Sequence, residues 1–366
     1  MQVAHGGQDI FINGRFVTQR TGGVQRFAWE IVRALDAELD EESSKLSQRN
    51  WTLLVPAKPP PGMSLRRISI RVVGGASGHV WDQLVLPRAA RGGIILNLTN
   101  GGPLLHPRSI VIIHDAAVFR TPRNFTRVYV LLHRILGSLL ARTSRLGTVS
   151  EFSRRELAAV LKIESSSIFV VSNSCEHLRS IVPDESVLSR LGLHAGKYFL
   201  FVGKPSPNKN LDAAIQAFSR LCCAEYKFVI VGKGDPAVFR RGLAPVPEGV
   251  MVTGHLGDGE LSAIFRSATA LVFPSLYEGF GIPPLEGMVS GCPVIASRIP
   301  AVEEVCGDAA LYFDPTDVNA LRAAMQSLLD QPELRTSLVA KGNERASTYS
   351  WRRSARQLIS AVADVE

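Results

Sequence analysis

Short apolar runs alternate with amphipathic segments along the whole chain of 366 residues. In the first half, this pattern predicts strands at 51–56, 67–73, 93–99, 109–115, 146–150 and 168–173. Helices are expected between them: one starts near Gly23, and one starts at Ser153, where Ser-Arg-Arg-Glu has the form of a capping box. Strands that alternate with helices are typical of parallel α/β sheets.

The second half restarts this alternation. It predicts strands at 197–203, 226–232, 249–254, 270–275, 292–297 and 309–314. We therefore predict an α/β protein with two Rossmann-like domains, at 1–178 and 197–348, joined by a linker at 179–196, and a C-terminal helix at 349–366 that packs back toward the first domain. Parallel sheets bind ligands at the carboxyl ends of their strands. The two sheets are thus expected to face a central cleft lined by the loops after 203, 232, 254 and 275.

Composition narrows the class of protein. Hydrophobic residues make up 46% of the chain, but no uncharged apolar run reaches the roughly 18 residues of a membrane-spanning helix. The N-terminus does not have the pattern of a signal peptide. Five cysteines, an odd number with no Cys-x-x-Cys, indicate a reduced cytoplasmic protein without structural zinc.

Charge is uneven along the chain, whose net charge is +8. Residues 1–180 hold 23 of the 41 basic and 13 of the 33 acidic residues, so the positive excess lies in the first half. Eight arginines fall between 120 and 155 against one acid, Glu151: they are Arg120, Arg123, Arg127, Arg134, Arg142, Arg145, Arg154 and Arg155. This pattern is typical of a solvated face or of a surface that binds an anionic membrane or acceptor. If it binds such a partner, we predict that the first four of these arginines form the surface. Nucleic acid fits less well, because aromatic residues are not interleaved with the arginines.

Two glycine-containing loops could hold phosphate. Gly232 to Ala237 reads G-x-G-x-x-A after a strand, a form of the dinucleotide fingerprint, but Pro236 and the missing acid before His255 speak against NAD. In FVGKPSPNKN, a strand ends at Gly203, and Lys204 and Lys209 precede a helix that starts at Asn210. Two lysines beside a helix N-terminus suit a phosphate, although they are also ordinary loop charges.

The stretch SLYEGFGIPPLEGM places two carboxylates around a turn. Glu278 lies in the loop, Pro283 and Pro284 start a helix that carries Glu286, and Gly291 ends it. Gly279 and Gly281 let backbone N–H groups approach a ligand closely. We interpret the two acids as acceptors of hydrogen bonds from sugar hydroxyls, not as an acid–base pair.

These residues resemble the donor site of family-four retaining glycosyltransferases, which have the GT-B fold. EGFGIPPLE is similar to the family's Glu-x7-Glu motif, and the likeness runs almost continuously from 198 to 315. In the first half, INGRFVTQRTGGVQRFAWEIVRAL, VIIHDAAVF and TVSEFSRREL resemble further family segments. The resemblance implies that the second domain binds a nucleotide-diphospho-sugar and that the first binds the acceptor.

By this resemblance, each site residue has an expected role. Glu286 holds the ribose, Glu278 contacts the donor sugar, and Lys209 contacts the diphosphate. The donor set is completed by Gly22, Gly23, Gly203, Lys204, Gly279, Phe280, Gly281 and Ile282, with Gly232, Gly254, His255 and Leu256 near the base. His114 is placed near the reacting centre, so that Glu278, His114, Lys209 and Lys204 form the expected catalytic set. Asn208 departs from the family's arginine, and Asn173-Ser174 from its Asn-Gly.

The resemblance also implies a reaction. We expect retaining, metal-independent hexosyl transfer, because lysines and glycine amides can neutralise the leaving diphosphate and no Asp-x-Asp is present. The similarity of INGRF and TGGVQR to mannosyl- and rhamnosyl-transferring members favours GDP-mannose over a UDP-sugar. The acceptor is expected to be a lipid-linked saccharide, reached by a peripheral protein at the cytoplasmic membrane face. The alternatives are another GT-B enzyme, such as a phosphorylase or an epimerase, and a non-catalytic nucleotide-sugar-binding membrane protein.

Overall fold

The chain folds into two compact α/β units. The computed structural model describes residues 8–19, 22–41, 46–59, 64–221, 223–232 and 247–365. The first unit combines the chain up to Asn173 with the segment from Trp351 onward, and the second is Ser174–Ser350. We predicted the first boundary at 178 and the start of the C-terminal segment at 349. The expected linker 179–196 belongs to the second unit, where it forms part of η5 (Glu176–Ser180) and all of α7 (Ser186–Arg190).

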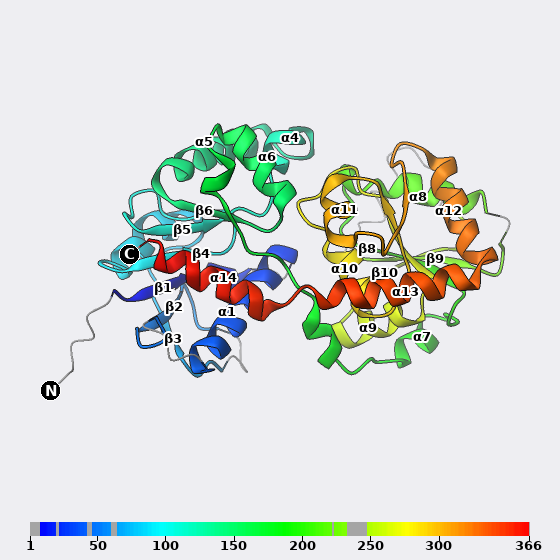
Figure 1. The fold of residues 1–366 in the computed structure, drawn as a ribbon, viewed down its shortest axis with the longest axis horizontal. Coiled ribbons are helices and arrows are strands. Elements are labelled where there is room, and N and C mark those ends of the chain that lie inside the picture. Colours follow the sequence, from blue (N-terminus) through cyan, green and yellow to red (C-terminus); the bar gives the residue numbers. More distant parts are fainter. Residues whose placement is uncertain are drawn as a thin grey trace. The chain divides into compact units, whose positions relative to one another are not determined.

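The first unit is built on a seven-stranded sheet in the order β3-β2-β1-β4-β5-β6-β7 (Figure 1). All its pairings are parallel. The strands are β1 (Ile10–Asn13), β2 (Trp51–Val55), β3 (Ile68–Val72), β4 (Ile94–Asn97), β5 (Ser109–Ile112), β6 (Arg145–Thr148) and β7 (Phe169–Val170). The four residues of β1, β4 and β5 are all buried, as expected for strands with both faces covered.

Helices cover this sheet because their apolar faces match it. On one face, Trp81 and Leu86 pack with Phe11 and Ile95 of the sheet. These two helical residues belong to a continuous segment of α2 (Gly78–Val80), the π-helix η2 (Trp81–Val85) and α3 (Leu86–Ala89). Beside it, α5 (Arg127–Thr143) and α6 (Glu151–Leu161) pack on Val111 and Leu146. The short elements η1 (Arg15–Thr18), α4 (Ala117–Arg120), η3 (Pro122–Asn124) and η4 (Ser165–Ser167) lie in the connections.

The C-terminal helix α14 (Trp351–Ala363) packs on α1 (Gly23–Glu41). The ring of Trp351 lies 5.9 Å from that of Phe27, edge to face. The guanidinium of Arg356 donates to Glu38, which is 4% exposed, over 2.6 Å. A buried carboxylate needs such a partner, and this contact fixes the helix on the first unit.

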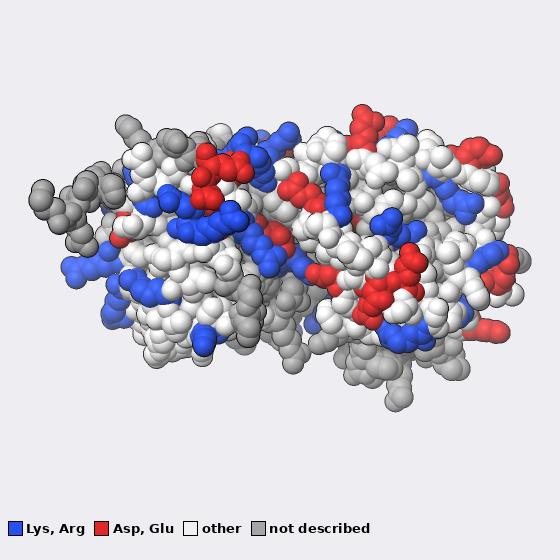
Figure 2. All heavy atoms as spheres, turned by 90° about the horizontal axis from the view of Figure 1, so that it is seen from below, with Lys and Arg blue, Asp and Glu red and all other residues white. Residues whose placement is uncertain are grey.

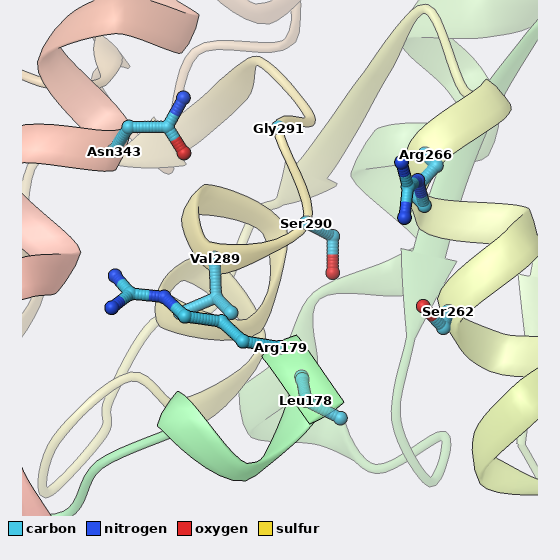
Figure 3. Close-up of a pocket in the computed structure, with 8 residues that line it drawn as sticks. All are labelled: Leu178, Arg179, Ser262, Arg266, Val289, Ser290, Gly291 and Asn343. Carbon is cyan, nitrogen blue, oxygen red and sulfur yellow. The ribbon is translucent and has the colours of Figure 1, made fainter. Parts of the chain in front are cut away.

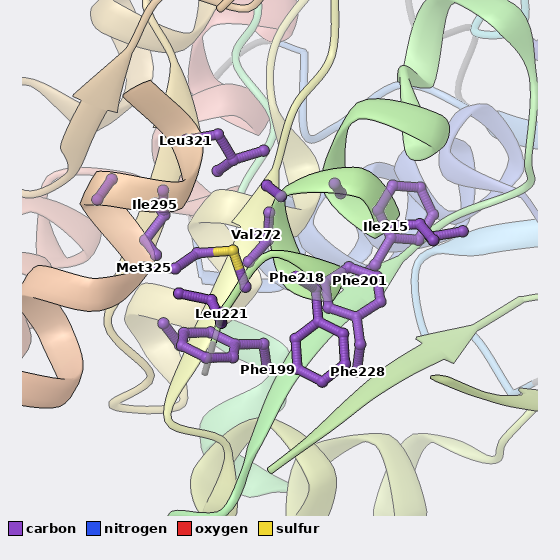
Figure 4. Close-up of a cluster of buried hydrophobic side chains, with 14 of the residues drawn as sticks. Phe199, Phe201, Ile215, Phe218, Leu221, Phe228, Val272, Ile295, Leu321 and Met325 are labelled. Carbon is purple, nitrogen blue, oxygen red and sulfur yellow. The ribbon is translucent and has the colours of Figure 1, made fainter. Parts of the chain in front are cut away.

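The second unit holds a six-stranded parallel sheet in the order β10-β9-β8-β11-β12-β13 (Figure 1). Its strands are β8 (Tyr198–Val202), β9 (Lys227–Val231), β10 (Val250–Gly254), β11 (Ala270–Phe273), β12 (Val294–Ser297) and β13 (Leu311–Phe313). The helices are α8 (Leu211–Ser219), α9 (Asp258–Ser267), α10 (Ile282–Val289), α11 (Pro300–Cys306), α12 (Val318–Asp330) and α13 (Pro332–Ser347), with η6 (Pro207–Lys209) before α8. Figure 4 shows the core between the sheet and α8 and α12, where Phe199, Phe228 and Met325 are fully buried.

Several predicted boundaries differ from the structure. The helix predicted from Ser153 begins at Glu151, because the hydroxyl of Ser150 caps it by accepting from the N–H of Ser153 over 3.0 Å. The capping box at Ser153 is therefore wrong. The strand predicted over 109–115 ends at Ile112. Most of the possible dinucleotide fingerprint, 233–237, lies outside the described residues.

Candidate active site

The second unit has a topological switch point between β8 and β11. The sheet grows from β8 toward β10 on one side and from β11 toward β13 on the other. The loops that leave the carboxyl ends of these two neighbours therefore diverge to opposite sides. In open parallel sheets, this is the place where ligands bind. The loop after β8 carries Lys204 and Lys209, and the loop after β11 carries Glu278.

An ion pair spans the switch point. The ammonium Nζ of Lys209 lies 2.6 Å from Oε1 of Glu278, and their side chains are only 20% and 14% exposed. The same Nζ lies 5.3 Å from the ring centroid of Phe273, at the end of β11. A partly desolvated pair interacts more strongly than one at the surface. The structure thus brings together a cation and a carboxylate that are 69 residues apart in the sequence.

Asn208 joins the two loops. Its carbonyl accepts from the N–H of Leu276 over 2.7 Å, and its side-chain oxygen accepts from the hydroxyl of Ser206 over 2.8 Å. Two residues further on, Asn210 has a left-handed φ of 51° and donates to the carbonyl of Pro315 over 2.9 Å. Asn208, which stands where the family's arginine is expected, therefore positions the loop that presents Lys209.

Three glycines lie side by side at the carboxyl ends of β8, β9 and β10. The N–H of Gly232 donates to the carbonyl of Gly254 over 2.9 Å, and the N–H of Gly203 donates to that of Val231, also over 2.9 Å. A Cβ at Gly232 would lie 2.2 Å from the carbonyl oxygen of Gly203, so a side chain there would clash with backbone. Nearby in sequence, His255 is exposed and Leu256 is buried.

The loop around Gly279 leads into α10. Gly281 takes a φ of +125°, which a residue with a side chain rarely adopts, and the helix starts at Ile282. Phe280 is buried with its ring 5.7 Å from that of Tyr349, and this contact anchors the loop. Glu286 lies half-buried in the second turn of α10. The N-terminus of this helix adds positive potential near Glu278.

The expected site residues of the first unit lie at the ends of its elements. Gly22 and Gly23 are exposed at the N-terminus of α1, whose first amides have no helical partner. His114 follows β5 and is 7% exposed, with its ring 4.8 Å from that of Phe27. Its Nε2 donates to the carbonyl of Leu98 over 2.9 Å. Burial lowers the pKa of His114 to about 4, so the imidazole is neutral at pH 7.

The four arginines named for an anionic surface differ in their contacts. Arg120 makes two hydrogen bonds to Glu156, at 2.5 and 3.1 Å, which neutralise its charge locally. Arg134 donates to the carbonyl of Phe119 over 3.1 Å but keeps its full charge. Arg123 and Arg127 are exposed, the first in η3 and the second at the start of α5. Arg123, Arg127 and Arg134 thus carry the basic character of this surface.

A pocket of about 320 Å³ lies elsewhere in the second unit, at the C-terminal end of α10 (Figure 3). It is lined by Leu178, Arg179, Ser262, Arg266, Val289, Ser290, Gly291 and Asn343. None of the predicted donor residues lines it. Since α10 begins at the carboxyl ends of the strands, its far end lies away from the switch point, and this pocket is separate from the predicted donor residues.

Sequence reasoning missed two residues that the structure joins. Asn13 and Asn97 are the last residues of β1 and β4, and Nδ2 of the first donates to Oδ1 of the second over 3.0 Å. A signal was present, because the runs IFIN and IILN both end in asparagine. Their pairing depends on strand order, which the pattern of apolar residues does not give.

Comparison with known proteins identifies the family of the chain. Residues 190–345 match the family model "Glycosyl transferases group 1". The chain is 30% identical to the O-antigen chain mannosyltransferase B of Escherichia coli, over 69% of this chain and 70% of the relative. It is 31% identical to the O-antigen chain mannosyltransferase RfbU of Salmonella typhimurium, over 63% of each chain.

Solved structures share the fold. HepE of Anabaena, solved with UDP and glucose, has a TM-score of 0.73 at 16% identity, covering 98% of this chain and 99% of its own. WaaG, a glycosyltransferase involved in lipopolysaccharide biosynthesis, has a TM-score of 0.70 at 16% identity, covering 96% and 99%. These neighbours are GT-B glycosyltransferases, and the predicted fold class is confirmed. With two parallel α/β units and a relative matched over two thirds of its length, the chain belongs to the group 1 glycosyltransferases.

Proposed function

We propose that this glycosyltransferase moves mannose from GDP-mannose to a lipid-linked saccharide, with retention of configuration and without a metal ion. The observation that carries the proposal is the Lys209–Glu278 pair across the β8–β11 switch point. A nucleotide-diphospho-sugar needs a cation at its diphosphate and a hydrogen-bond acceptor at its sugar hydroxyls. The choice of mannose is supported by the two O-antigen mannosyltransferases to which the chain is similar.

The reaction breaks the bond between the sugar's C1 and the diphosphate oxygen, and the electron pair stays on that oxygen. Lys209 and Lys204, together with the N-terminus of α10, stabilise the growing negative charge. A well-placed donor of this kind contributes on the order of 3 kcal/mol to the transition state. The acceptor hydroxyl then attacks C1 from the face that the diphosphate leaves, and its proton passes to the diphosphate oxygen.

Glu278 positions the sugar in this proposal and does not attack it. Its carboxylate already pairs with Lys209, which lowers its nucleophilicity. An oxygen of the carboxylate can still accept from a sugar hydroxyl. Retention then follows from attack on the leaving-group face, with no covalent glycosyl-enzyme.

The test is transfer from GDP-mannose to a soluble saccharide in the presence of EDTA, with proton NMR of the first product. We expect undiminished turnover in EDTA and an α-mannosidic product. A β product, or loss of turnover that Mg²⁺ or Mn²⁺ restores, would contradict the proposal. A thermal-shift panel of GDP, UDP, dTDP and ADP with their sugars identifies the donor, and a larger shift for UDP-glucose than for GDP-mannose would overturn the choice of base and sugar.

An anionic membrane is the proposed setting, and α5 is the proposed contact. Its outer face exposes five aliphatic side chains at helical spacing: Val128 (78%), Leu131 (63%), Leu132 (49%), Ile135 (51%) and Leu139 (38%). We call these residues the α5 stripe. Arg127, Arg134 and Arg142 are exposed beside it on the same helix. An apolar stripe with flanking arginines suits a helix that lies in the interface of an anionic bilayer.

No helix among residues 8–365, leaving aside the undescribed gaps, is long and apolar enough to cross a membrane. On the face drawn in Figure 2, basic and acidic side chains are interspersed. This face is therefore not uniformly basic, and the proposed attraction to lipid rests on the arginines around α5.

A further inference from the structure

The first unit has its own topological switch point, between β1 and β4, which are neighbours although β2 and β3 separate them in the sequence. Asn13 and Asn97 end these strands and lie opposite each other, since Ile12 pairs with Leu96 one residue earlier. Their side chains point to the face that η2 and α5 cover, because Phe11 and Ile95, two residues earlier, pack against Trp81 there. The switch point is where ligands of parallel sheets bind.

A polar network is buried at this point. Asn13 donates to Oδ1 of Asp82 over 3.1 Å and to Asn97 over 3.0 Å, and the guanidinium of Arg15 pairs with the Asp82 carboxylate. Asn97 donates in turn to the hydroxyl of Ser109 over 3.0 Å. Asn13, Asp82 and Asn97 are at most 2% exposed. The network contains one cation and one anion, so it presents no net charge.

Aromatic rings form the solvent side of this network. His79 of α2 is 49% exposed, and its Nδ1 lies 3.9 Å from Oδ2 of Asp82. Its ring meets that of His133 on α5 edge to face at 5.9 Å. On α5, His133 stacks on Tyr129 at 3.7 Å, and Tyr129 stacks on Phe125 at 5.3 Å. Two helices that start at the carboxyl edge of the sheet thus place imidazole and phenol groups together.

The π-helix η2 holds these parts in place. Such helices are rare and are often found at functional sites. Gln83, which follows Asp82 in η2, donates to the carbonyl of Gly102 over 2.9 Å and accepts from the N–H of Leu104 over 3.0 Å. These bonds tie the loop after β4 to the segment that carries His79 and Asp82.

We propose that His79, Tyr129 and His133, supported by the Asn13–Asp82–Asn97 network, bind a neutral pyranose of the acceptor. This deepens the proposed function, on which it rests. Stacking covers both faces of Tyr129, so the exposed ring edges offer apolar surface to the C–H groups of a sugar. The phenol hydroxyl and the imidazole nitrogens, except the Nδ1 of His133 that bonds to the carbonyl of Tyr129, offer donors and acceptors to its hydroxyls. None of these residues belongs to the donor set.

The charges of the network and of His79 favour a neutral sugar over an anionic ligand. Arg15, the cation of this network, is paired with Asp82 and is 9% exposed. Burial, and secondly the charge of Arg15, lower the pKa of His79, so that its imidazole is uncharged at pH 7. A phosphate at this network would lose hydration without gaining an unpaired cation from it.

The test is saturation-transfer NMR on the full chain, with the methyl glycosides of mannose, glucose, galactose, rhamnose and N-acetylglucosamine as probes. We expect signal from at least one of them, also with GDP bound. Tyr129→Ala and His79→Ala should lower the signal at least fivefold. Tyr129→Phe keeps the ring and should retain most of it. His194→Ala, which removes an exposed imidazole in the second unit, should not change it.

Each outcome decides. No signal from any glycoside, or equal signal in the Ala variants and the wild-type protein, would overturn the proposal. Perturbation of the His79 and His133 resonances by inorganic phosphate but by no glycoside would identify an anion site instead. Because binding is measured without turnover, a protein that binds a glycoside at this site but does not use GDP-mannose would contradict only the proposed function.

Discussion

Lys209 and Glu278 form an ion pair of 2.6 Å, although the roles expected for them lie on opposite sides of the bond that breaks. The lysine is expected at the diphosphate and the glutamate at the sugar hydroxyls. In the structure, each compensates the charge of the other inside a partly desolvated loop. The two residues should therefore depend on each other for stability, and each should be needed for transfer.

A double-mutant cycle measures this dependence. Lys209→Met leaves Glu278 without its cation, and we expect a loss of about 1–3 kcal/mol in the free energy of unfolding. Glu278→Gln should cost less, because the amide still hydrogen-bonds. The double variant should be more stable than the sum of the single losses implies, as measured by urea unfolding. Additive losses would mean that the pair does not form in solution.

The same variants separate stability from turnover. Lys209→Met and Glu278→Gln should each lower kcat about 100-fold or more, because in the proposed reaction each removes a charged group next to the bond that breaks. The double variant should regain stability but not activity. Lys341→Met, which removes a lysine from a pair with Asp308 on the same unit, serves as the control and should keep full turnover.

The fold could be predicted from the sequence because it depends on apolar periodicity. Buried strands such as β4 and β8 are continuous apolar runs, and the restart of the pattern at 197 separates the two sheets. The short strand β1 (Ile10–Asn13) was not among the strands predicted from this pattern. The loops that carry Lys209 and Glu278 were also expected to lie close together, since both residues stand in motifs, while their role in donor binding stays a prediction. The capping residue of α6 was harder to predict, because Ser150 and Ser153 both precede apolar residues at helical spacing. In the structure, Ser150 caps the helix.

What the sequence could not give is the joining of distant polar residues. Asn13, Asp82 and Asn97 are separated by up to 84 positions and meet only because β1 lies beside β4. The sequence also did not show which charged side chains are paired in the folded protein. Arg120 counts as one of eight arginines in the sequence, but in the structure Glu156 neutralises it.

The α5 stripe predicts a membrane contact that can be removed without unfolding the protein. Leu131→Ser combined with Ile135→Ser removes two side chains that are 63% and 51% exposed, so stability should change by less than about 0.5 kcal/mol. Binding to liposomes with anionic lipid, measured by sedimentation at low salt, should fall roughly 10-fold or more. Leu105→Ser, at a side chain that is 91% exposed outside α5, is the control. Equal loss in the control, or binding to neutral liposomes alone, would contradict the prediction.

His114 predicts how stability depends on pH. Its pKa is about 4 in the folded chain and near 6.5 when unfolded, so between these values the unfolded chain binds more protons. Stability should therefore fall as pH drops from 6.5 toward 4, by at most about 3 kcal/mol from this residue. His114→Gln should remove that part of the slope. Urea unfolding of both proteins at pH 4.5 and 7.5 measures the difference, and parallel slopes would show that His114 titrates normally.

The loops after β8 and β9 approach each other so closely at Gly232 that a side chain there should be costly. An alanine Cβ would stand 2.2 Å from the carbonyl oxygen of Gly203, at a residue whose φ is +150°. The clash is with backbone, so relief requires the ends of β8 and β9 to separate. We expect Gly232→Ala to cost about 2–4 kcal/mol of stability and to weaken GDP binding, since the loop after β8 carries Lys209.

Gly196→Ala tests strain alone, because its φ is +72° and nothing lies within 4 Å of the added Cβ. It should cost about 1 kcal/mol, as φ strain does, and leave GDP binding unchanged. Calorimetric titration with GDP distinguishes the two variants. Equal effects would mean that strain, and not the contact between the loops, explains the glycine at 232.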